Sequence, residues 1–119
     1  MNAADRDLVD RYFEAMREGA SAEQQLLGLF TDDAVYVEPF AGEPRTHRGR
    51  AAIRIAFRAG WESPPPDLKL HVDRIDVDED RVFSEWTCTS PAFPHPIRGR
   101  DEYTMRDGKI ARLEVTLAP

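Results

Sequence analysis

Residues 97–117 read IRGRDEYTMRDGKIARLEVTL and contain the strongest structural signal in the chain. In this stretch two runs of alternating apolar and polar side chains flank the dipeptide Asp107-Gly108. Alternation with a period of two is typical of β-strands, and Asp-Gly between two such runs is typical of a tight hairpin turn. The stretch therefore predicts a hairpin of two long strands, Ile97 to Arg106 and Lys109 to Leu117.

Two further runs with the same period lie upstream, from Leu68 to Val77 and from Arg81 to Ser90. Acidic residues separate these two runs, and a proline-rich segment, Pro91 to Pro96, separates the second run from the hairpin. We therefore expect four antiparallel strands. The apolar phase of the first run slips near Asp73, which predicts a β-bulge there.

The first 60 residues contain helical patterns and one short strand. The apolar stripe Leu8, Val9, Tyr12, Phe13 and Met16 predicts a first helix that ends at Gly19. Ser21 and Gln24 have capping-box spacing, so we expect a second helix from Ser21 to about Thr31. The remaining predictions are a strand at Ala34–Glu38, a loop at Phe40–Gly49, and a third helix that starts near Arg50 and ends at Gly60.

This order of elements predicts an α+β protein, because the helices are segregated from the main sheet. A chain of 119 residues with 41% hydrophobic side chains is the size of one domain, which we place at residues 1–119. A strongly bent antiparallel sheet packed on three helices would form a cone. The interior of such a cone is a natural pocket for a small molecule.

Composition argues against several classes of partner. The formal net charge is -6, so a nucleic acid would be repelled overall, although five arginines gather between Arg45 and Arg58. No apolar run approaches the roughly 20 residues of a membrane span. The lone Cys88 cannot form an intramolecular disulfide, and it suits a reducing compartment. We expect a cytoplasmic protein.

Asp101 is the strongest candidate for a functional residue. It is the only charged residue on the apolar face of its predicted strand, between Gly99 and Tyr103. A carboxyl group buried there either finds a partner or stays protonated with a raised pKa. A structural aspartate paired with an arginine such as Arg54 is the alternative interpretation, and periodicity alone leaves both open.

Glu38 and Tyr12 are the other two candidates. Glu38 ends a strand, where Pro39 holds it in extended geometry, and a strand end at a cavity mouth suits a general base. Tyr12 lies in the middle of a buried helical stripe, so its hydroxyl must find a partner. Taken alone, Glu38 is also compatible with a surface position and Tyr12 with a core position.

Together these segments resemble the ketosteroid isomerase branch of the nuclear transport factor 2-like superfamily, which also contains the SnoaL-like polyketide cyclases. The resemblance covers nearly the whole chain. It rests on RYFE at 11–14, FTDDAVYVEP at 30–39, GEPR at 42–45, RAAIR at 50–54 and DEYTM at 101–105. It implies that Glu38 shuttles the proton while Tyr12 and Asp101 donate hydrogen bonds to the oxyanion.

Two departures from the isomerase pattern affect this assignment. The base is Glu38 where the isomerases usually have aspartate. Phe30 and Phe57 stand where well-known members have tyrosines that hydrogen-bond the oxyanion tyrosine. We place the substrate against six side chains: Phe30, Phe57, Trp61, Trp86, Tyr103 and Met105.

The resulting hypothesis is a cofactor-independent isomerase that moves a proton next to the carbonyl of an apolar ketone. A SnoaL-like polyketide cyclase or lyase is one alternative, and a non-catalytic small-molecule-binding domain is another. The histidines His47, His71 and His95 lack metal-ligand spacing, so we expect no metal site. Arg50, Arg54 and Arg58 are interpreted as a solvated helix face. The exposed face of the sheet favours a homodimer, as the resemblance also implies.

Overall fold

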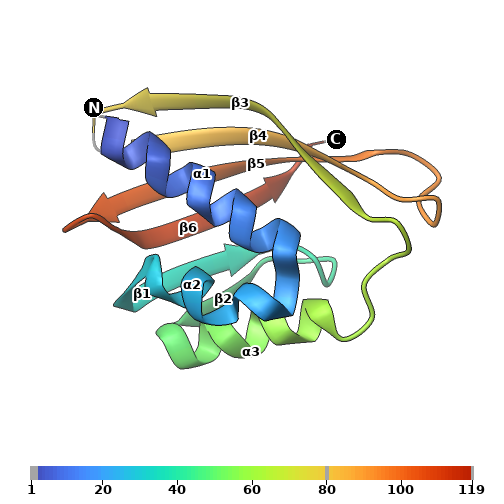
Figure 1. The fold of residues 1–119 in the computed structure, drawn as a ribbon, viewed down its shortest axis with the longest axis horizontal. Coiled ribbons are helices and arrows are strands. Elements are labelled where there is room, and N and C mark those ends of the chain that lie inside the picture. The colour runs from blue at the N-terminus through green and yellow to red at the C-terminus, as the bar shows by residue number, and fades with distance from the viewer. Residues whose placement is uncertain (1–2, 80, 119) are drawn as a thin grey trace.

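The computed structural model describes residues 3–79 and 81–118, and Figure 1 shows their arrangement. The helical elements are α1 (Ala3–Glu18), the 3-10 turn η1 (Gly19–Ala22), α2 (Glu23–Gly28) and α3 (Arg50–Trp61). The strands are β1 (Phe30–Glu38), β2 (Arg45–Arg48), β3 (Lys69–Asp78), β4 (Arg81–Thr89), β5 (Ile97–Arg106) and β6 (Lys109–Leu117). The α+β class predicted from the sequence is confirmed.

The six strands form one mixed sheet in the order β2-β1-β6-β5-β4-β3. The four strands β3 to β6 are antiparallel neighbours, as the alternating patterns predict. Arg106 pairs with Lys109 across the Asp107-Gly108 turn, which confirms the hairpin. The register of β3 against β4 shifts between Val72 and Arg74, which confirms the bulge near Asp73.

The N-terminal half of the sheet differs from the prediction in two ways. β1 begins at Phe30 rather than at Ala34, and β2 lies inside the segment predicted as a loop. Asp32 and Asp33 are exposed and interrupt the apolar alternation of β1. The sequence pattern therefore does not reveal that the strand begins at Phe30. The side chains of β2 are mostly exposed, so that strand is held by backbone pairing to β1 and carries no hydrophobic pattern.

The second helix also starts differently. Ser21 lies within the turn η1, and α2 begins at Glu23 without a side-chain cap. The Ser21 hydroxyl donates weakly, over 3.5 Å, to the carbonyl of Glu18. The capping box predicted from Ser21 and Gln24 is therefore wrong, because the 3-10 turn shifts the helix start by two residues.

The helices cover the inner face of the curled sheet. In Figure 1, α1 crosses in front of the strands β3 to β6, while α3 runs beside β1 and β2. The predicted stripe of α1 is buried, and Tyr12 packs edge-on against Phe30 and Tyr103. These contacts place an aromatic cluster between α1 and the sheet.

Two arginines of α3 form contacts with neighbouring elements. Arg50 donates two hydrogen bonds, of 3.1 and 2.6 Å, to the carbonyl of Phe30, and it pairs with Asp32. Arg58 pairs with Glu23 of α2. Arg58 remains exposed, as the interpretation of a solvated face has it, but Arg50 is half-buried; both also form contacts because α2 and the start of β1 come within reach of α3.

Candidate functional site

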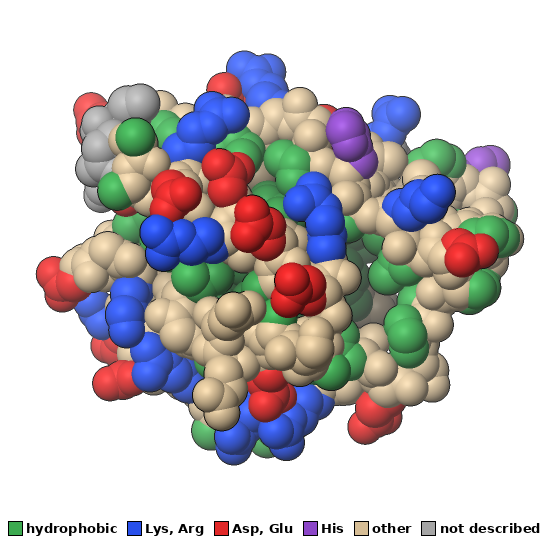
Figure 2. Space-filling model, in the orientation of Figure 1, with side chains coloured by type: hydrophobic (Ala, Val, Ile, Leu, Met, Phe, Trp, Pro, Cys, Tyr) green, Lys and Arg blue, Asp and Glu red, His purple; other side chains and the backbone are tan. Residues whose placement is uncertain are grey.

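A cavity of about 700 Å³ lies between α1, α3 and the inner face of the sheet. Its wall is mainly apolar and includes the aromatic side chains of Phe13, Phe57, Trp61, Trp86 and Phe93. On the face shown in Figure 2, the surface is hollowed between hydrophobic side chains. A cavity of this size and lining suits a small molecule with an extensive apolar surface.

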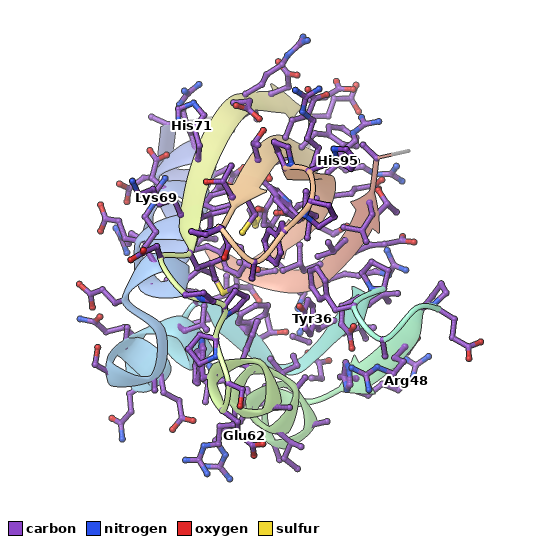
Figure 3. The ribbon with its side chains drawn as sticks, turned by 90° about the vertical axis from the view of Figure 1, so that its right-hand side faces the viewer. Tyr36, Arg48, Glu62, Lys69, His71 and His95 are labelled. Atoms are coloured by element: carbon purple, nitrogen blue, oxygen red, sulfur yellow. The ribbon has the colours of Figure 1, made fainter. Side chains whose placement is uncertain are left out.

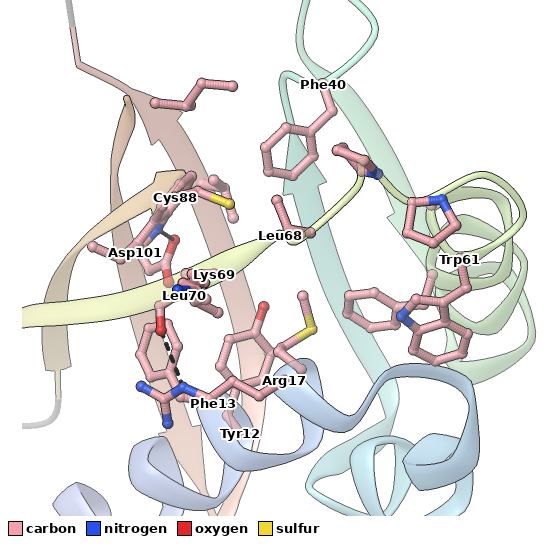
Figure 4. Close-up of a pocket in the computed structure, with 18 of the residues that line it drawn as sticks. Tyr12, Phe13, Arg17, Phe40, Trp61, Leu68, Lys69, Leu70, Cys88 and Asp101 are labelled. Atoms are coloured by element: carbon pink, nitrogen blue, oxygen red, sulfur yellow. Dashed lines mark hydrogen bonds between the residues drawn. The ribbon is translucent and has the colours of Figure 1, made fainter. Parts of the chain in front are cut away.

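The polar side chains in this wall include Tyr12 from α1, Tyr36 from β1 and Asp101 from β5. Burial raises the pKa of both tyrosines; the neighbouring Tyr36 and Asp101 raise that of Tyr12 further, and Glu38 and Asp101 raise that of Tyr36 further. The three groups Tyr12, Tyr36 and Asp101 line the same cavity. Figure 4 shows Tyr12 and Asp101 there, and Figure 3 shows Tyr36 between the curled sheet and α3.

Neither tyrosine hydroxyl has a hydrogen-bond partner among residues 3–79 and 81–118. Within these residues, every side-chain nitrogen or oxygen atom that is fully shielded from solvent has a hydrogen-bond partner. The hydroxyls of Tyr12 and Tyr36 therefore face the open space of the cavity rather than packed protein. Both are available as donors to an oxygen atom of a ligand.

Asp101 is buried and is held by three neutral donors. Trp86 Nε1 donates to Oδ1 over 2.9 Å, while the hydroxyls of Ser84 and Tyr103 donate to Oδ2 over 3.1 and 2.8 Å. Burial raises the pKa of Asp101 to about 6, although the three hydrogen bonds act in the opposite direction. No arginine pairs with Asp101 in the described residues, so the structural alternative involving Arg54 is not what the geometry shows.

The oxygens of Ser84, Tyr103 and Asp101 form a closed triangle, because the Ser84 and Tyr103 hydroxyl oxygens are also only 2.9 Å apart. Three hydrogen bonds around a triangle need three protons, and the two hydroxyls supply only two. When Asp101 is ionised, one contact lacks a proton. Protonation of Asp101 supplies the third once one of the two hydroxyl hydrogens turns into the Ser84–Tyr103 contact, so this triangle can accept or release one proton while its oxygen atoms stay in place.

Glu38 has different surroundings. Its side chain is only 4% exposed, and Oε2 accepts hydrogen bonds from Arg45 and His47 over 2.9 and 2.8 Å. The backbone N–H of Phe40 donates to Oε1 over 2.8 Å. Burial favours the neutral acid, but the bonds from His47, Phe40 and Arg45 outweigh it and lower the pKa of Glu38.

Glu38 does not line the cavity, whereas Tyr12 and Asp101 do. Glu38 is instead bound by side chains of β2, a strand that the sequence did not predict. Antiparallel pairing sets Arg45 opposite Glu38 and His47 opposite Tyr36, so both basic side chains lie on the same face of the sheet as Glu38. They hold its carboxylate at the edge of the site.

Of the six side chains expected to contact substrate, Phe57, Trp61 and Trp86 line the cavity. Phe30, Tyr103 and Met105 do not. Phe30 is fully buried in the aromatic cluster with Tyr12 and Phe57, and the hydroxyl of Tyr103 is directed at Asp101.

Sequence reasoning missed Tyr36, which stacks on Phe57 with ring centroids 4.9 Å apart. Phe57 in turn stacks on Trp61 at 6.0 Å. Tyr36 shares a strand face with Glu38, so the alternation that made Glu38 a candidate could also have indicated Tyr36.

The described part of the chain offers no group of three histidine, cysteine, aspartate or glutamate side chains arranged to hold a metal ion. Within residues 3–79 and 81–118, none of the helices combines the length and the apolar character needed to cross a bilayer.

The fold is similar to several solved structures. A candidate polyketide cyclase from Sinorhizobium meliloti is 25% identical, with a TM-score of 0.76 over 92% of this chain and 94% of that one. A candidate ketosteroid isomerase from Kribbella flavida is 22% identical, with a TM-score of 0.75 over 98% and 78% of the two chains. TerC, crystallised with polyporic acid, is 22% identical, with a TM-score of 0.78 over 98% and 92%.

A comparison with curated proteins gave no significant match. The model of the SnoaL-like domain matches residues 9–113, which is most of the chain and includes Tyr12, Tyr36 and Asp101. This match confirms the resemblance to the SnoaL-like members of the superfamily. The chain therefore belongs to the SnoaL-like domain family.

Proposed function

We propose that this protein catalyses proton transfer at the carbon next to the carbonyl of an apolar ketone, without a cofactor. One observation carries the proposal: among the residues that the structure describes, a buried carboxyl group without a cationic partner lines the same cavity of about 700 Å³ as two tyrosine hydroxyls without a hydrogen-bond partner. Enolisation needs this combination, a group that moves a proton and donors that stabilise the developing oxyanion.

In this mechanism Asp101 is the base and later the acid. Its ionised carboxylate takes the proton from the α-carbon, and the electron pair of the broken C–H bond moves onto the carbonyl oxygen. The hydroxyls of Tyr12 and Tyr36 donate hydrogen bonds to that oxygen. A pKa of about 6 suits both roles near neutral pH, because the carboxylate is available and its conjugate acid is readily formed.

The fate of the enolate decides between two reactions. If Asp101 returns the proton to a different carbon, the double bond shifts and the reaction is an isomerisation. If the enolate carbon attacks a second carbonyl of the same molecule, a carbon–carbon bond forms and the reaction is a cyclisation. The similar structures include candidates for both activities, and both begin with the same proton transfer.

The experiment measures deuterium exchange from D₂O into the α-position of a panel of apolar ketones by proton NMR. The wild-type protein, Asp101→Asn and Glu38→Gln are compared. We expect the Asp101 variant to lose roughly two to four orders of magnitude in exchange rate and the Glu38 variant to retain most of it. The reverse pattern would identify Glu38 as the base, as the family resemblance implies.

A binding role without catalysis is the second candidate. The observation that favours it is that three neutral donors already satisfy Asp101. In that case the wild-type protein would bind apolar ketones in the cavity, with quenching of tryptophan fluorescence, but would not accelerate exchange for any of them.

A further inference from the structure

Two cationic side chains also line the cavity: Arg17 from the end of α1 and Lys69 from the start of β3. Both residues are exposed, and neither forms an ion pair with any residue that the structure describes. Arg17 is nevertheless oriented, because its Nε donates a 3.1 Å hydrogen bond to the carbonyl of Leu70 (Figure 4). That contact leaves both terminal nitrogens of the guanidinium free to bind a ligand.

The sheet register gives the spacing along the strands between Lys69 and Asp101. In β4, Ser84 pairs with Asp101, Cys88 pairs with Leu70, and Thr89 pairs with Lys69. Thr89 is five residues from Ser84, so at about 3.3 Å per residue the backbone of Lys69 is offset from that of Asp101 by roughly 17 Å along the strand direction. Arg17 lies on α1, and its hydrogen bond to the carbonyl of Leu70 places it beside the start of β3.

Exposed apolar side chains surround the same opening. Phe40, Leu68 and Leu117 are 56%, 45% and 43% exposed, and all three line the cavity. Large exposed hydrophobic side chains gathered at one opening mark a surface that a ligand covers. The cavity therefore runs from a hydrogen-bonding end formed by Tyr12, Tyr36 and Asp101 to a mouth that is both apolar and cationic.

We propose that Arg17 and Lys69 form an anion subsite, so that the preferred substrate is an amphiphile. Its carbonyl lies at Tyr12, Tyr36 and Asp101, its elongated apolar body fills the cavity, and a carboxylate or comparable anion lies at the mouth. The position of the carbonyl rests on the proposed function, but the anion subsite does not. The net charge of -6 repels anions at long range, so the selection comes from these two local cations.

The test uses two fluorescent dyes with the same ring framework, anilinonaphthalene sulfonate and the uncharged phenylnaphthylamine. Binding is followed by dye emission and by energy transfer from tryptophan. Trp61 and Trp86 are the only tryptophans in the sequence and both line the cavity, so transfer is strongest for dye bound in this site. The wild-type protein is compared with the double variant Arg17→Gln/Lys69→Gln.

The matched control is Arg6→Gln/Lys109→Gln, which removes the same charge from residues outside the cavity. We expect the cavity variant to bind the sulfonate dye about fivefold to twentyfold more weakly and to bind the neutral dye within twofold of the wild type. The control should match the wild type for both dyes.

Equal weakening of both dyes would overturn the anion subsite, because it would mean that the substitutions damage the cavity itself. If the control variant bound the sulfonate dye as weakly as the cavity variant does, the anion subsite would be overturned too, because the loss of affinity would then come from the change in net charge. Neither dye is enolised, so the result is independent of whether Asp101 catalyses exchange. Loss of the proposed function and loss of the anion subsite are thus separate outcomes.

Discussion

The indole ring of Trp86 lies directly over Gly99, its partner on the neighbouring strand: a Cβ atom at residue 99 would come within 2.1 Å of Trp86 Cζ2. No other residue type leaves room for the ring in this position. Because the ring lies there, its Nε1 reaches Oδ1 of Asp101, two residues further along β5. Gly99 thereby helps to set the electrostatic environment of Asp101.

Gly99→Ala should displace the indole and break its hydrogen bond to Asp101. Since that bond favours the ionised carboxyl, its loss should raise the pKa of Asp101 further, as measured by NMR titration of the side-chain carboxyl. Overpacking should lower the free energy of unfolding by about 1–3 kcal/mol. Gly28→Ala is the control, because a Cβ there has no neighbour within 4 Å. An unchanged titration of Asp101 in Gly99→Ala would contradict this coupling.

The stability of the protein should depend on pH through Asp101. Its pKa is raised from 3.8 to about 6 on folding, so between these values the folded state holds a proton that the unfolded state has lost. The contribution of Asp101 to stability is therefore full below pH 4, falls as the pH rises to about 6, and then stays lower by on the order of 3 kcal/mol.

Asp101→Asn should remove this pH dependence, because asparagine does not ionise. Urea denaturation of both proteins at several pH values between 4 and 7.5 measures the difference. The variant should gain stability relative to the wild type as the pH rises. A stability difference that is flat across this range would mean that Asp101 has an ordinary pKa.

Tyr12→Phe and Tyr36→Phe should each leave the free energy of unfolding nearly unchanged, because neither hydroxyl has a hydrogen-bond partner to lose within residues 3–79 and 81–118. Tyr103→Phe should cost about 1 kcal/mol or more, since its hydroxyl bonds Asp101 and Ser84. If the two hydroxyls hold an oxyanion, each of the first two variants should slow α-proton exchange by about two to three orders of magnitude. Full exchange activity in both would exclude that role.

Glu38→Gln should destabilise the protein at neutral pH by about 1.5–3 kcal/mol, because it leaves Arg45 and His47 without their charged acceptor. The pKa of Glu38 is lowered on folding, so its contribution is present above the unfolded value of 4.5 and is lost as the pH falls through the folded value. The stability difference from the wild type should accordingly shrink under acidic conditions.

Glu102→Gln provides the comparison for Glu38, because Glu102 forms an exposed pair with Arg81 over 3.3 Å. Exposed pairs contribute between 0 and about 1 kcal/mol. Equal effects of the two substitutions in denaturation experiments would show that the contacts around Glu38 carry no special stability.

The regions predictable from sequence are those in which one face of an element is buried. The hairpin at Asp107-Gly108, the bulge near Asp73 and the stripe of α1 all leave a periodic apolar pattern. The isolation of Asp101 on the apolar face of β5 follows from the same pattern. That its partners in the described part of the chain are neutral could not be predicted, because Ser84 and Trp86 reach it from a different strand.

The strand β2 left no such pattern, so the contacts that surround Glu38 could not be predicted from the sequence. Arg45 and His47 lie in a segment with exposed side chains and two nearby prolines, where backbone pairing to β1 decides the structure. Side-chain periodicity carries no information about such a strand. The family resemblance gives the position of Glu38 in the sequence but not the residues that surround it.

The parallel pairing of β1 with β6 has a consequence for the order in which this protein can be assembled. Phe30 pairs with Ile110, 80 residues later in the chain, whereas β1 and β2 are neighbours in sequence. During synthesis β1 can gain β2 early, but its other edge stays open until β6 has emerged from the ribosome. An open strand edge invites pairing with other chains, so nascent chains halted before β6 should be the species most prone to aggregate.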